Sequence, residues 1–333
     1  FLKELSEEVD ALEGRTGRRY ALIAESDLND TRIVQQYEKG GFGIEGQWVD
    51  DFHHSLHTVL TGENAGYYQD FGKMEYLAKA FRQAFVYDGM YSDFRKRTVG
   101  NSSTGFSPSN FVVCLQNHDQ VGNRLLGERI SQLVSFEEQK LAAGTMLTAP
   151  FVPMLFMGEE FGEDKPFQYF VSHNDPDLVK AVQEGRKREF EYFNKEKGHG
   201  FPDPQAEETF KNSSLNWNFK KDEHKNALFG WYKELLKLRK QGIFEPFGSS
   251  GTKSQGDEER KLLQVSAEAG DFSLYGIYNF NDEPFRLKIS EEKKPEIIIA
   301  SADEQWGGEY KTADLKEKDN ILIPQKSLLV FKM

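Results

Sequence analysis

The sequence predicts an α/β fold in which four strand–helix units build one sheet, followed by an all-β terminal domain. Short apolar runs alternate with segments of helical periodicity, and these runs lie at 20–25, 47–51, 111–117 and 152–157. Acidic or polar residues follow each run directly. After residue 242, short strand-like segments separated by turn residues replace the helical pattern.

Helices are expected between the strands from apolar spacing and capping residues. Residues 1–12 carry apolar side chains on one face, and Gly14 is expected to end this helix. Apolar residues at helical spacing predict a second helix over 73–86. Ser135 followed three residues later by Glu138 is a capping-box pattern, which predicts that a helix begins there.

The last strand of the α/β region leads into a long insertion at 159–225, rich in aromatic and charged residues. One helix is expected within it, around 178–193. A final amphipathic helix is expected over 226–241, with Gly242 as its stop.

The change of pattern divides the chain into an α/β unit, 1–242, and a β-sandwich domain, 243–333. Turn residues such as Asn281-Asp282 and Gly307-Gly308 separate the expected strands of the second domain. These strands are expected at 272–280, 284–289, 296–300 and 321–333.

Composition excludes several classes of partner. The formal net charge is −12, from 54 acidic and 42 basic residues, which argues against nucleic acid and anionic membrane surfaces because both need a basic face. No apolar run approaches the roughly 20 residues needed to span a bilayer. Cys114 is the single cysteine, so the chain cannot form an internal disulfide, which fits a reducing cytoplasm.

Polar side chains gather where two buried strands end. Glu25 and Asp27 follow one strand, and Asn117, His118 and Asp119 follow another. In parallel α/β folds that end of the strand is where substrates bind. Two acids at such positions indicate acid chemistry on a neutral, hydroxyl-rich substrate, and glycoside cleavage is the leading candidate.

A cluster of two aspartates and three histidines offers a metal-site alternative. His53 and His57 are four residues apart, as in a zinc-binding helix, but the HEXXH pattern is absent and the segment is expected to follow a strand. Sugar binding is therefore preferred, and no metal or other cofactor is expected. Of Asp50 and Asp51, the alternation of a strand makes Asp50 the more exposed candidate.

Six motifs in this order carry a family resemblance: AESDLND (24–30), QWVDDFHHSLH (47–57), GENAGYYQDFG (62–72), NHDQVGNR (117–124), FMGEEFGE (156–163) and PFQYFVSH (166–173). The chain resembles glycoside hydrolase family 13, the α-amylase superfamily, and within it a subgroup that releases trehalose from maltooligosyl trehalose. The resemblance covers nearly the whole chain. It implies the last four βα units of a (β/α)8 TIM barrel.

The resemblance also implies roles for the strand-end residues. Glu25 would be the general acid/base of a retaining glycosidase, which uses two carboxylates about 5–5.5 Å apart. Asp119 would hold two sugar hydroxyls and favour the developing positive charge, and His118 would donate a hydrogen bond to the same sugar. The alternatives are a capping or ion-paired acid for Glu25 and a satisfied core histidine for His118.

Further residues are assigned to the substrate cleft: Asp27, Asp50, His54, Tyr68, Arg124 and Glu160. Glu159 could also bind hydroxyls, and Trp48, Tyr67 and Phe71 could stack on glucose rings. The alternatives are surface ion pairs for the charged residues and core positions for the aromatic ones.

One expected residue is missing from the sequence. The family's nucleophile is an aspartate on the fourth barrel strand, which the resemblance places upstream of Phe1. Four βα units cannot close an eight-stranded barrel, and unpaired edges would remain at 20–25 and 152–157. The missing N-terminal half of the barrel is therefore a candidate partner, and this chain alone is expected to be inactive.

Three functions remain open at this stage. The first is hydrolysis of the α-1,4 bond next to the terminal trehalose of maltooligosyl trehalose or a related α-glucan. The second is another activity of the superfamily, such as branching, debranching or amylase activity. The third is an inactive carbohydrate-binding fragment.

Overall fold

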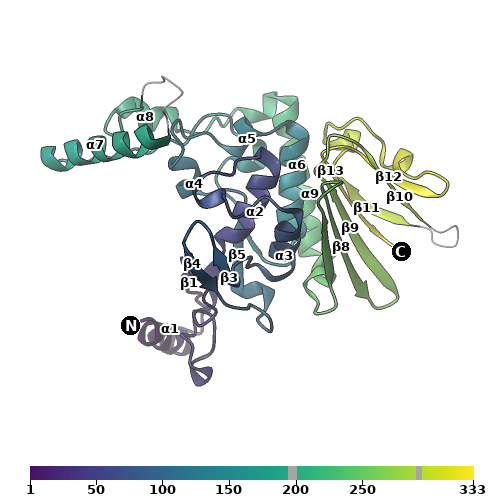
Figure 1. The fold of residues 1–333 in the computed structure, drawn as a ribbon, viewed down its shortest axis with the longest axis horizontal. Helices are drawn as coiled ribbons and strands as arrows, with labels where there is room; N and C mark the ends of the chain where they lie inside the picture. The colour runs from purple at the N-terminus through teal and green to yellow at the C-terminus, as the bar shows by residue number, and fades with distance from the viewer. Residues whose placement is uncertain (194–200, 290–294) are drawn as a thin grey trace.

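A computed structural model shows a four-stranded parallel sheet with its helices and, beside them, a five-stranded antiparallel sheet (Figure 1). The structure describes residues 1–193, 201–289 and 295–333. Within these ranges, no helix combines the length and apolar character needed to cross a membrane.

The parallel sheet has the strand order β1-β2-β5-β6, and every neighbouring pair is parallel. All four predicted strands are present, although each is shorter than its apolar run. Because parallel strands share one direction, the polar residues that follow them meet at one edge of the sheet. The strands are β1 (Ile23–Ala24), β2 (Gly46–Trp48), β5 (Phe111–Cys114) and β6 (Val152–Met154).

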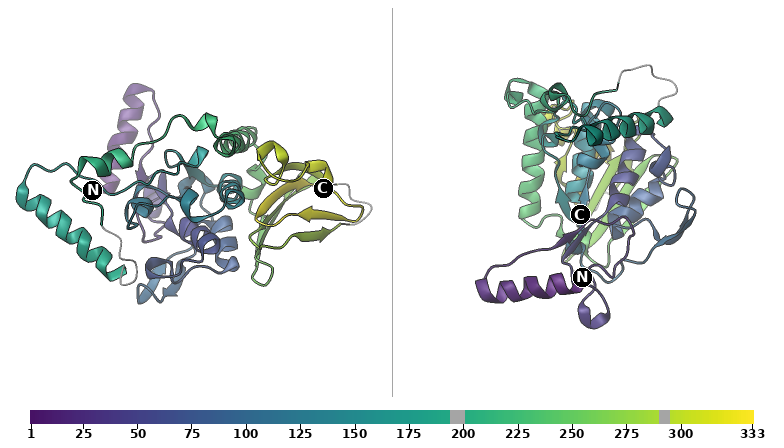
Figure 2. Two further views of the ribbon diagram at one scale, coloured as in Figure 1. Left: turned by 90° about the horizontal axis from the view of Figure 1, so that it is seen from above. Right: turned by 90° about the vertical axis from the view of Figure 1, so that its left-hand side faces the viewer.

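The predicted helices are present with shifted ends. The helices of the described residues are α1 (Leu2–Thr16), α2 (Asp50–Thr61), α3 (Met74–Gln83), α4 (His118–Gly122), α5 (Ile130–Leu133), α6 (Phe136–Thr148), α7 (Pro176–Phe193), α8 (Glu207–Asn212) and α9 (Glu223–Lys240). Of these, α2, α4, α5 and α8 were not predicted. α1 and α7 lie at the periphery, away from the antiparallel sheet (Figures 1 and 2).

Helix ends test the capping predictions directly. The prediction that Gly14 ends α1 is wrong, because the helix continues to Gly17, which adopts φ 66° and donates its N–H to the Glu13 carbonyl. A single glycine inside a helix costs only about 1 kcal/mol, so Gly14 does not stop it. The capping box of Ser135 and Glu138 is confirmed at the start of α6.

The end of α9 also agrees with prediction. Its last residue is Lys240, and Gly242 follows with φ 78°, a left-handed conformation that glycine adopts without strain. The helix begins earlier than expected, after Asp222, whose side chain accepts a hydrogen bond from the backbone N–H of Lys225.

Two hairpin strands were not predicted. β3 (Asp88–Ser92) and β4 (Arg97–Gly100) form an antiparallel pair between α3 and β5. Their sequence lacks a continuous apolar run, and only Ser92 and Val99 of the two strands are buried.

The antiparallel sheet has the order β11-β13-β9-β8-β7, and β10 and β12 form a separate two-stranded sheet. The strands are β7 (Lys253–Asp257), β8 (Leu262–Ala269), β9 (Phe272–Asn279), β10 (Phe285–Lys288), β11 (Glu296–Ala300), β12 (Asn320–Ile323) and β13 (Ser327–Lys332). β7 and β8 were not predicted.

Alternate residues of β13 face two different cores. Leu328 and Val330 belong to the large core shared with the helices, whereas Leu329 and Phe331 belong to a smaller core with Ile321 and other residues near β10 and β12. This two-residue period shows a sheet covered on both faces, as in a sandwich.

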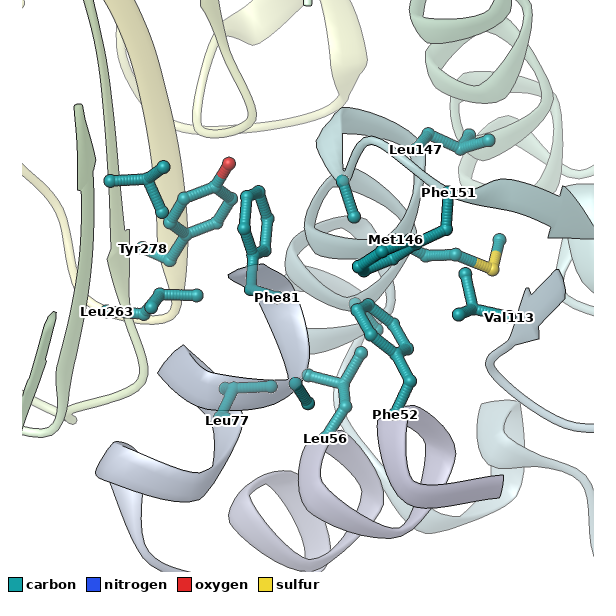
Figure 3. Close-up of a cluster of buried hydrophobic side chains, with 14 of the residues drawn as sticks. Phe52, Leu56, Leu77, Phe81, Val113, Met146, Leu147, Phe151, Leu263 and Tyr278 are labelled. Atoms are coloured by element: carbon teal, nitrogen blue, oxygen red, sulfur yellow. The ribbon is translucent and has the colours of Figure 1, made fainter. Parts of the chain in front are cut away.

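The large core joins the two parts of the molecule (Figure 3). Side chains from α2, α3, α6 and β5 interdigitate with Leu263 and Tyr278 of the antiparallel sheet, and both are fully buried. The Tyr278 hydroxyl lies 2.6 Å from Thr148 Oγ1 on α6. The boundary between residues 242 and 243 stays a prediction.

Candidate active site

A cavity of about 540 Å³ lies at the C-terminal ends of β1, β2 and β5. Four carboxylates line it: Glu25, Asp27, Asp50 and Asp119. They come from three separate segments of the sequence, each directly after a strand, and the parallel sheet brings them together.

The segment after β1 supplies two cavity acids and one buried brace. Glu25 is exposed, and Asp27 pairs with Arg95, whose Nη1 lies 3.0 Å from Asp27 Oδ2. Asn29 is buried with φ 52°, and its Nδ2 donates to Asp51 Oδ2 at 2.7 Å and to the Tyr87 carbonyl at 3.1 Å. This brace holds the loop that carries the two acids against α2.

Asp50 and Asp51 begin α2 and do not end a strand, so the predicted strand over 47–51 is too long. Asp51 is buried, and its Oδ2 accepts hydrogen bonds from the backbone N–H groups of Val86 at 2.7 Å and Tyr87 at 2.8 Å. Asp50 faces the cavity. It is the more exposed of the two, as predicted, but because of its place in the first helical turn rather than a strand alternation.

Crowding of carboxylates changes the acidity of Asp50. Burial, followed by the nearby charges of Asp27, Glu25 and Asp119, raises the pKa of Asp50 to about 6. The positive charges near the cavity therefore do not fully compensate the negative charge of its carboxylates.

Asn117, His118 and Asp119 form the start of α4. The Asn117 side chain accepts from the backbone N–H groups of Asp119 and Gln120, and Gln120 Oε1 accepts from the Asn117 N–H at 2.8 Å. This capping box orients Asp119 towards the cavity. His118 does not line the cavity, and its exposed ring lies 3.5 Å from Asp119.

Aromatic side chains share the cavity wall with the acids. Trp48, Tyr67 and Phe94 line it, and Tyr67 and Phe94 are substantially exposed. His54 also lines it, with its ring 5.1 Å from that of Tyr67. Burial, with the charges of His57 and Arg95, lowers the pKa of His54 to about 3, so the ring is neutral. Its buried Nδ1 has no hydrogen-bond partner in the described structure.

A second set of residues lies behind this wall, and we call it the buried network: His53, His57, Glu63, Tyr68 and Arg124. His53 bonds to the Leu115 carbonyl through Nδ1 and accepts from the Tyr68 hydroxyl at 2.9 Å. His57 Nε2 lies 2.7 Å from Glu63 Oε2, and Arg124 donates to both Glu63 oxygens at 2.9 Å.

The buried network accounts for two residues that the sequence assigned to substrate. Tyr68 is 7% exposed, and neither it nor Arg124 lines the large cavity. The Tyr68 hydroxyl and both terminal nitrogens of Arg124 are bonded within the protein, as is usual for buried polar groups. Phe71, a predicted stacking residue, is also buried in the core.

The network also bears on the metal alternative. The histidines lie on helix α2, whereas the sequence predicted that they follow a strand. Their place on a helix is compatible with a zinc site, so the predicted strand no longer disfavours a metal. However, both ring nitrogens of His53 and the Nε2 atom of His57 are engaged in protein hydrogen bonds. Among the described residues, no three potential ligands are grouped to hold a metal ion.

Glu159 and Glu160 lie apart from the large cavity. Glu160 Oε2 accepts from the Gly158 N–H at 2.9 Å, and Glu160 borders a separate cavity of about 300 Å³. Glu159 is buried beside Tyr232, and burial raises its pKa to about 8. The rule that polar residues after a strand line the site misplaces them, because four residues separate the end of β6 from the helical turn that carries them.

Sequence reasoning missed the arginine side of the cavity. Arg95 and Arg97 line it together with Phe94, all from the unpredicted β3–β4 hairpin. A local signal existed, since an aromatic residue stands among three basic ones at 94–97, but nothing in it indicated which distant segment it would meet.

No family model matches the chain. Several curated relatives are named malto-oligosyltrehalose trehalohydrolase. The relative from Saccharolobus solfataricus is 48% identical over 220 residues, 66% of this chain and 37% of that protein. The relative from a Rhizobium species is 41% identical over 290 residues, 86% of this chain and 48% of that protein. The chain is homologous to the malto-oligosyltrehalose trehalohydrolases.

The chain spans less than half the length of these trehalohydrolases. A solved structure from Salmonella typhimurium, provisionally assigned as an alpha amylase, matches with TM-score 0.80 and 32% identity over 98% of this chain and 53% of that one. The alpha-amylase of H. orenii matches with TM-score 0.56 at 14% identity, a likeness of fold alone. The fold is therefore that of part of an α-amylase-type TIM barrel with a C-terminal β domain.

Proposed function

We propose that this chain supplies the acid/base side of a retaining glycosidase active site that cleaves the α-1,4 bond next to the terminal trehalose of maltooligosyl trehalose. The observation that carries the proposal is the meeting of Glu25 and Asp119 in one strand-end cavity. The names of the trehalohydrolase relatives support the choice of substrate.

In this proposal Glu25 is the general acid and base. It protonates the glycosidic oxygen as the carbon–oxygen bond breaks, and trehalose leaves. Its carboxylate then accepts a proton from the water that hydrolyses the glycosyl intermediate. The nucleophilic carboxylate is a separate aspartate, which the resemblance places upstream of Phe1. Glu25 suits the role sterically because it is exposed to the cavity and accepts no hydrogen bond within the described structure.

The other cavity residues bind the sugar. Asp119, on its capped helix, accepts hydrogen bonds from two hydroxyls, and its charge favours the oxocarbenium-like transition state. His118 lies beside it and donates to the same ring. Asp50 and Asp27 accept from further hydroxyls, while Trp48 and Tyr67 offer aromatic faces to glucose rings.

A second candidate is a different α-amylase-type activity. The Salmonella structure favours it, because it covers nearly all of this chain.

The proposal also includes a partner and a location. The partner is the missing half of the barrel, and the cytoplasmic location rests on the single, buried Cys114.

The test uses the full-length protein that contains this chain, with intact mass checked. It is incubated separately with maltooligosyl trehalose and with starch, and free trehalose and reducing sugar are measured. Trehalose release without attack on starch supports the proposal. Starch breakdown without trehalose release identifies the second candidate. The 333-residue chain alone is assayed in parallel and should give no turnover.

A further inference from the structure

We propose that Asn29 is a positioning residue for the general acid. Its buried amide, bonded to Asp51, fixes the loop that carries Glu25, so that proton transfer to the leaving group depends on this hydrogen bond. The inference deepens the proposed function and rests on it for the role of Glu25. Asn29 does not line the cavity, so it acts through Glu25 and not on the sugar itself.

The loop after β1 has one buried anchor. Residues 25–30 belong to no helix or strand, and Asn29 is the buried residue among them, at 2% exposed. Glu25 is exposed, and the Asp27 side chain remains largely exposed in its pair with Arg95. A loop without regular structure takes its position from its anchored residues, so the place of Glu25 depends on the residue four positions later.

Asn29 combines the features that this anchor point requires. Its φ of 52° is left-handed, a conformation that asparagine adopts more readily than most residues. Its Nδ2 donates to Asp51 Oδ2 at 2.7 Å and to the Tyr87 carbonyl at 3.1 Å, and its own carbonyl accepts from the Asn101 N–H at 3.1 Å. An uncharged amide with two N–H donors suits two acceptors, whereas an aspartate here would be repelled by Asp51.

Asp51 gives the loop a fixed point of reference. It is buried, and its Oδ2 also accepts from the backbone N–H groups of Val86 at 2.7 Å and Tyr87 at 2.8 Å. Its neighbour in the first turn of α2, Asp50, lines the cavity. The loop of Glu25 and the start of α2 are therefore held by one buried carboxylate, which sets the cavity acids of these two segments relative to each other.

The loop has a second attachment, which should preserve the fold when the amide is removed. Asn101 Oδ1 accepts from the Thr31 N–H at 3.0 Å and from Thr31 Oγ1 at 2.8 Å. Packing is also close, because a Cβ atom at Gly100 would collide with the Tyr87 carbonyl oxygen and lie 3.1 Å from Asn29 Cβ. Without the amide, the loop stays attached at Thr31 while its acid-bearing end is released. A displacement of about 1 Å can cost about 10²-fold in rate.

The leaving group separates positioning of the acid from general damage to the site. When a sugar leaves, the carbon–oxygen bond breaks, its electron pair goes to the oxygen, and Glu25 supplies the proton. When fluoride leaves from a glycosyl fluoride, the electron pair of the carbon–fluorine bond goes with it and no proton from Glu25 is needed. A misplaced acid therefore slows loss of a sugar much more than loss of fluoride.

The experiment uses the full-length protein that contains this chain and measures the rate of the first turnover. Trehalose release is followed with maltooligosyl trehalose, and fluoride release with α-maltotriosyl fluoride. The first turnover is chosen because Glu25 also acts as the base towards water in the second step. Asn29→Ala and Asn29→Gly both remove the amide, and glycine adopts the left-handed φ without strain. Both variants should release trehalose about 10–100-fold more slowly and fluoride less than about threefold more slowly.

Two further variants calibrate this selectivity. Glu25→Gln removes the acid itself and should show the same preference for fluoride as leaving group. Asn279→Ala is the matched control for lost stability, since its buried Nδ2 donates to the carbonyls of Glu283 at 2.9 Å and Pro324 at 3.0 Å in the β domain. It should change either rate by less than about twofold. The melting temperature of every variant is recorded.

Each outcome decides a separate point. Equal losses on both substrates in the Asn29 variants, or loss of their folded state, would make Asn29 a structural residue and overturn the inference while the proposed function stands. Near-native trehalose release by Asn29→Gly would overturn it as well, as would the same selectivity in Asn279→Ala. Near-native trehalose release by Glu25→Gln, or equal losses on both substrates in that variant, would overturn the proposed function and the inference with it.

Discussion

Two faces of helix α2 carry titratable side chains that differ in their partners within the protein. Asp50 and His54, one helical turn apart, face the open cavity, where carboxylates crowd together and a buried histidine nitrogen lacks a partner. His53 and His57, also one turn apart, face the buried network, where hydrogen bonds and ion pairs connect the groups. Uncompensated polar groups are costly unless a ligand uses them, so the first face is suited to binding and the second to support.

The network also supports the cavity geometrically. The Glu63–Arg124 pair joins the loop after α2, which leads to Tyr67, to the segment directly after α4, the helix that carries Asp119. The pair is partly buried and bidentate, which makes this link stiffer than a single-contact surface ion pair. Acidic residues and histidines thus serve binding in the cavity and support in the buried network, and the groups around them distinguish the two roles.

The largest effect should come from the cavity. Glu25→Gln in the full-length protein should lower kcat by about 10²–10⁴-fold, the usual contribution of a general acid/base, while the melting temperature stays constant. The assay is trehalose release from maltooligosyl trehalose. Near-native turnover would remove Glu25 from the acid/base role.

A substitution in the buried network should change the stability of the protein and not only its catalytic activity. Glu63→Ala leaves Arg124 and His57 without their shared partner and should lower the free energy of unfolding by about 2 kcal/mol, measured by denaturant titration. Asp27→Ala is the control from the cavity side. The Asp27 side chain of its ion pair with Arg95 is largely exposed, so the free energy of unfolding should fall by less than about 1 kcal/mol. Equal losses in the two variants would erase the distinction between the faces.

The crowded acids predict a pH dependence. The pKa of Asp50 is about 6 in the folded chain, above its ordinary value of 3.8, so the folded state takes up the proton first as pH falls. Ionised Asp50 therefore opposes folding above pH 6, and this penalty is relieved as pH falls from about 6 to about 4. Asp50→Asn should raise the melting temperature at pH 7, and its advantage should shrink by pH 4. A gain that is constant between these pH values would contradict the assignment.

The smallest effect is expected for Tyr68, which the sequence assigned to substrate binding and the structure places in the buried network. Tyr68→Phe removes the hydroxyl that donates to His53 and should cost about 1 kcal/mol of stability. Because Tyr68 does not line the cavity, KM for the substrate should stay within about twofold of the wild type. A severalfold rise in KM at unchanged stability would return Tyr68 to the substrate-binding set.

Local patterns determined much of this protein. Apolar runs located the four parallel strands, and the residues directly after them placed Glu25, Asp50 and Asp119 at one sheet edge, because parallel strands end on the same side. The capping box of Ser135 and the stop at Gly242 depend only on nearby backbone groups, so they too were readable. The motifs also carried the resemblance that the trehalohydrolase relatives support.

Tertiary structure decided which neighbouring residues reach the cavity. Tyr67 lines it and Tyr68 does not, and the same holds for His54 and His53, because adjacent residues point to different faces and only packing fixes which face is open. The placement of Arg124 on Glu63 and of the 88–100 hairpin beside Asp27 joins segments about 60 residues apart. Such contacts depend on the path of the whole chain, which short-range periodicity and capping do not encode.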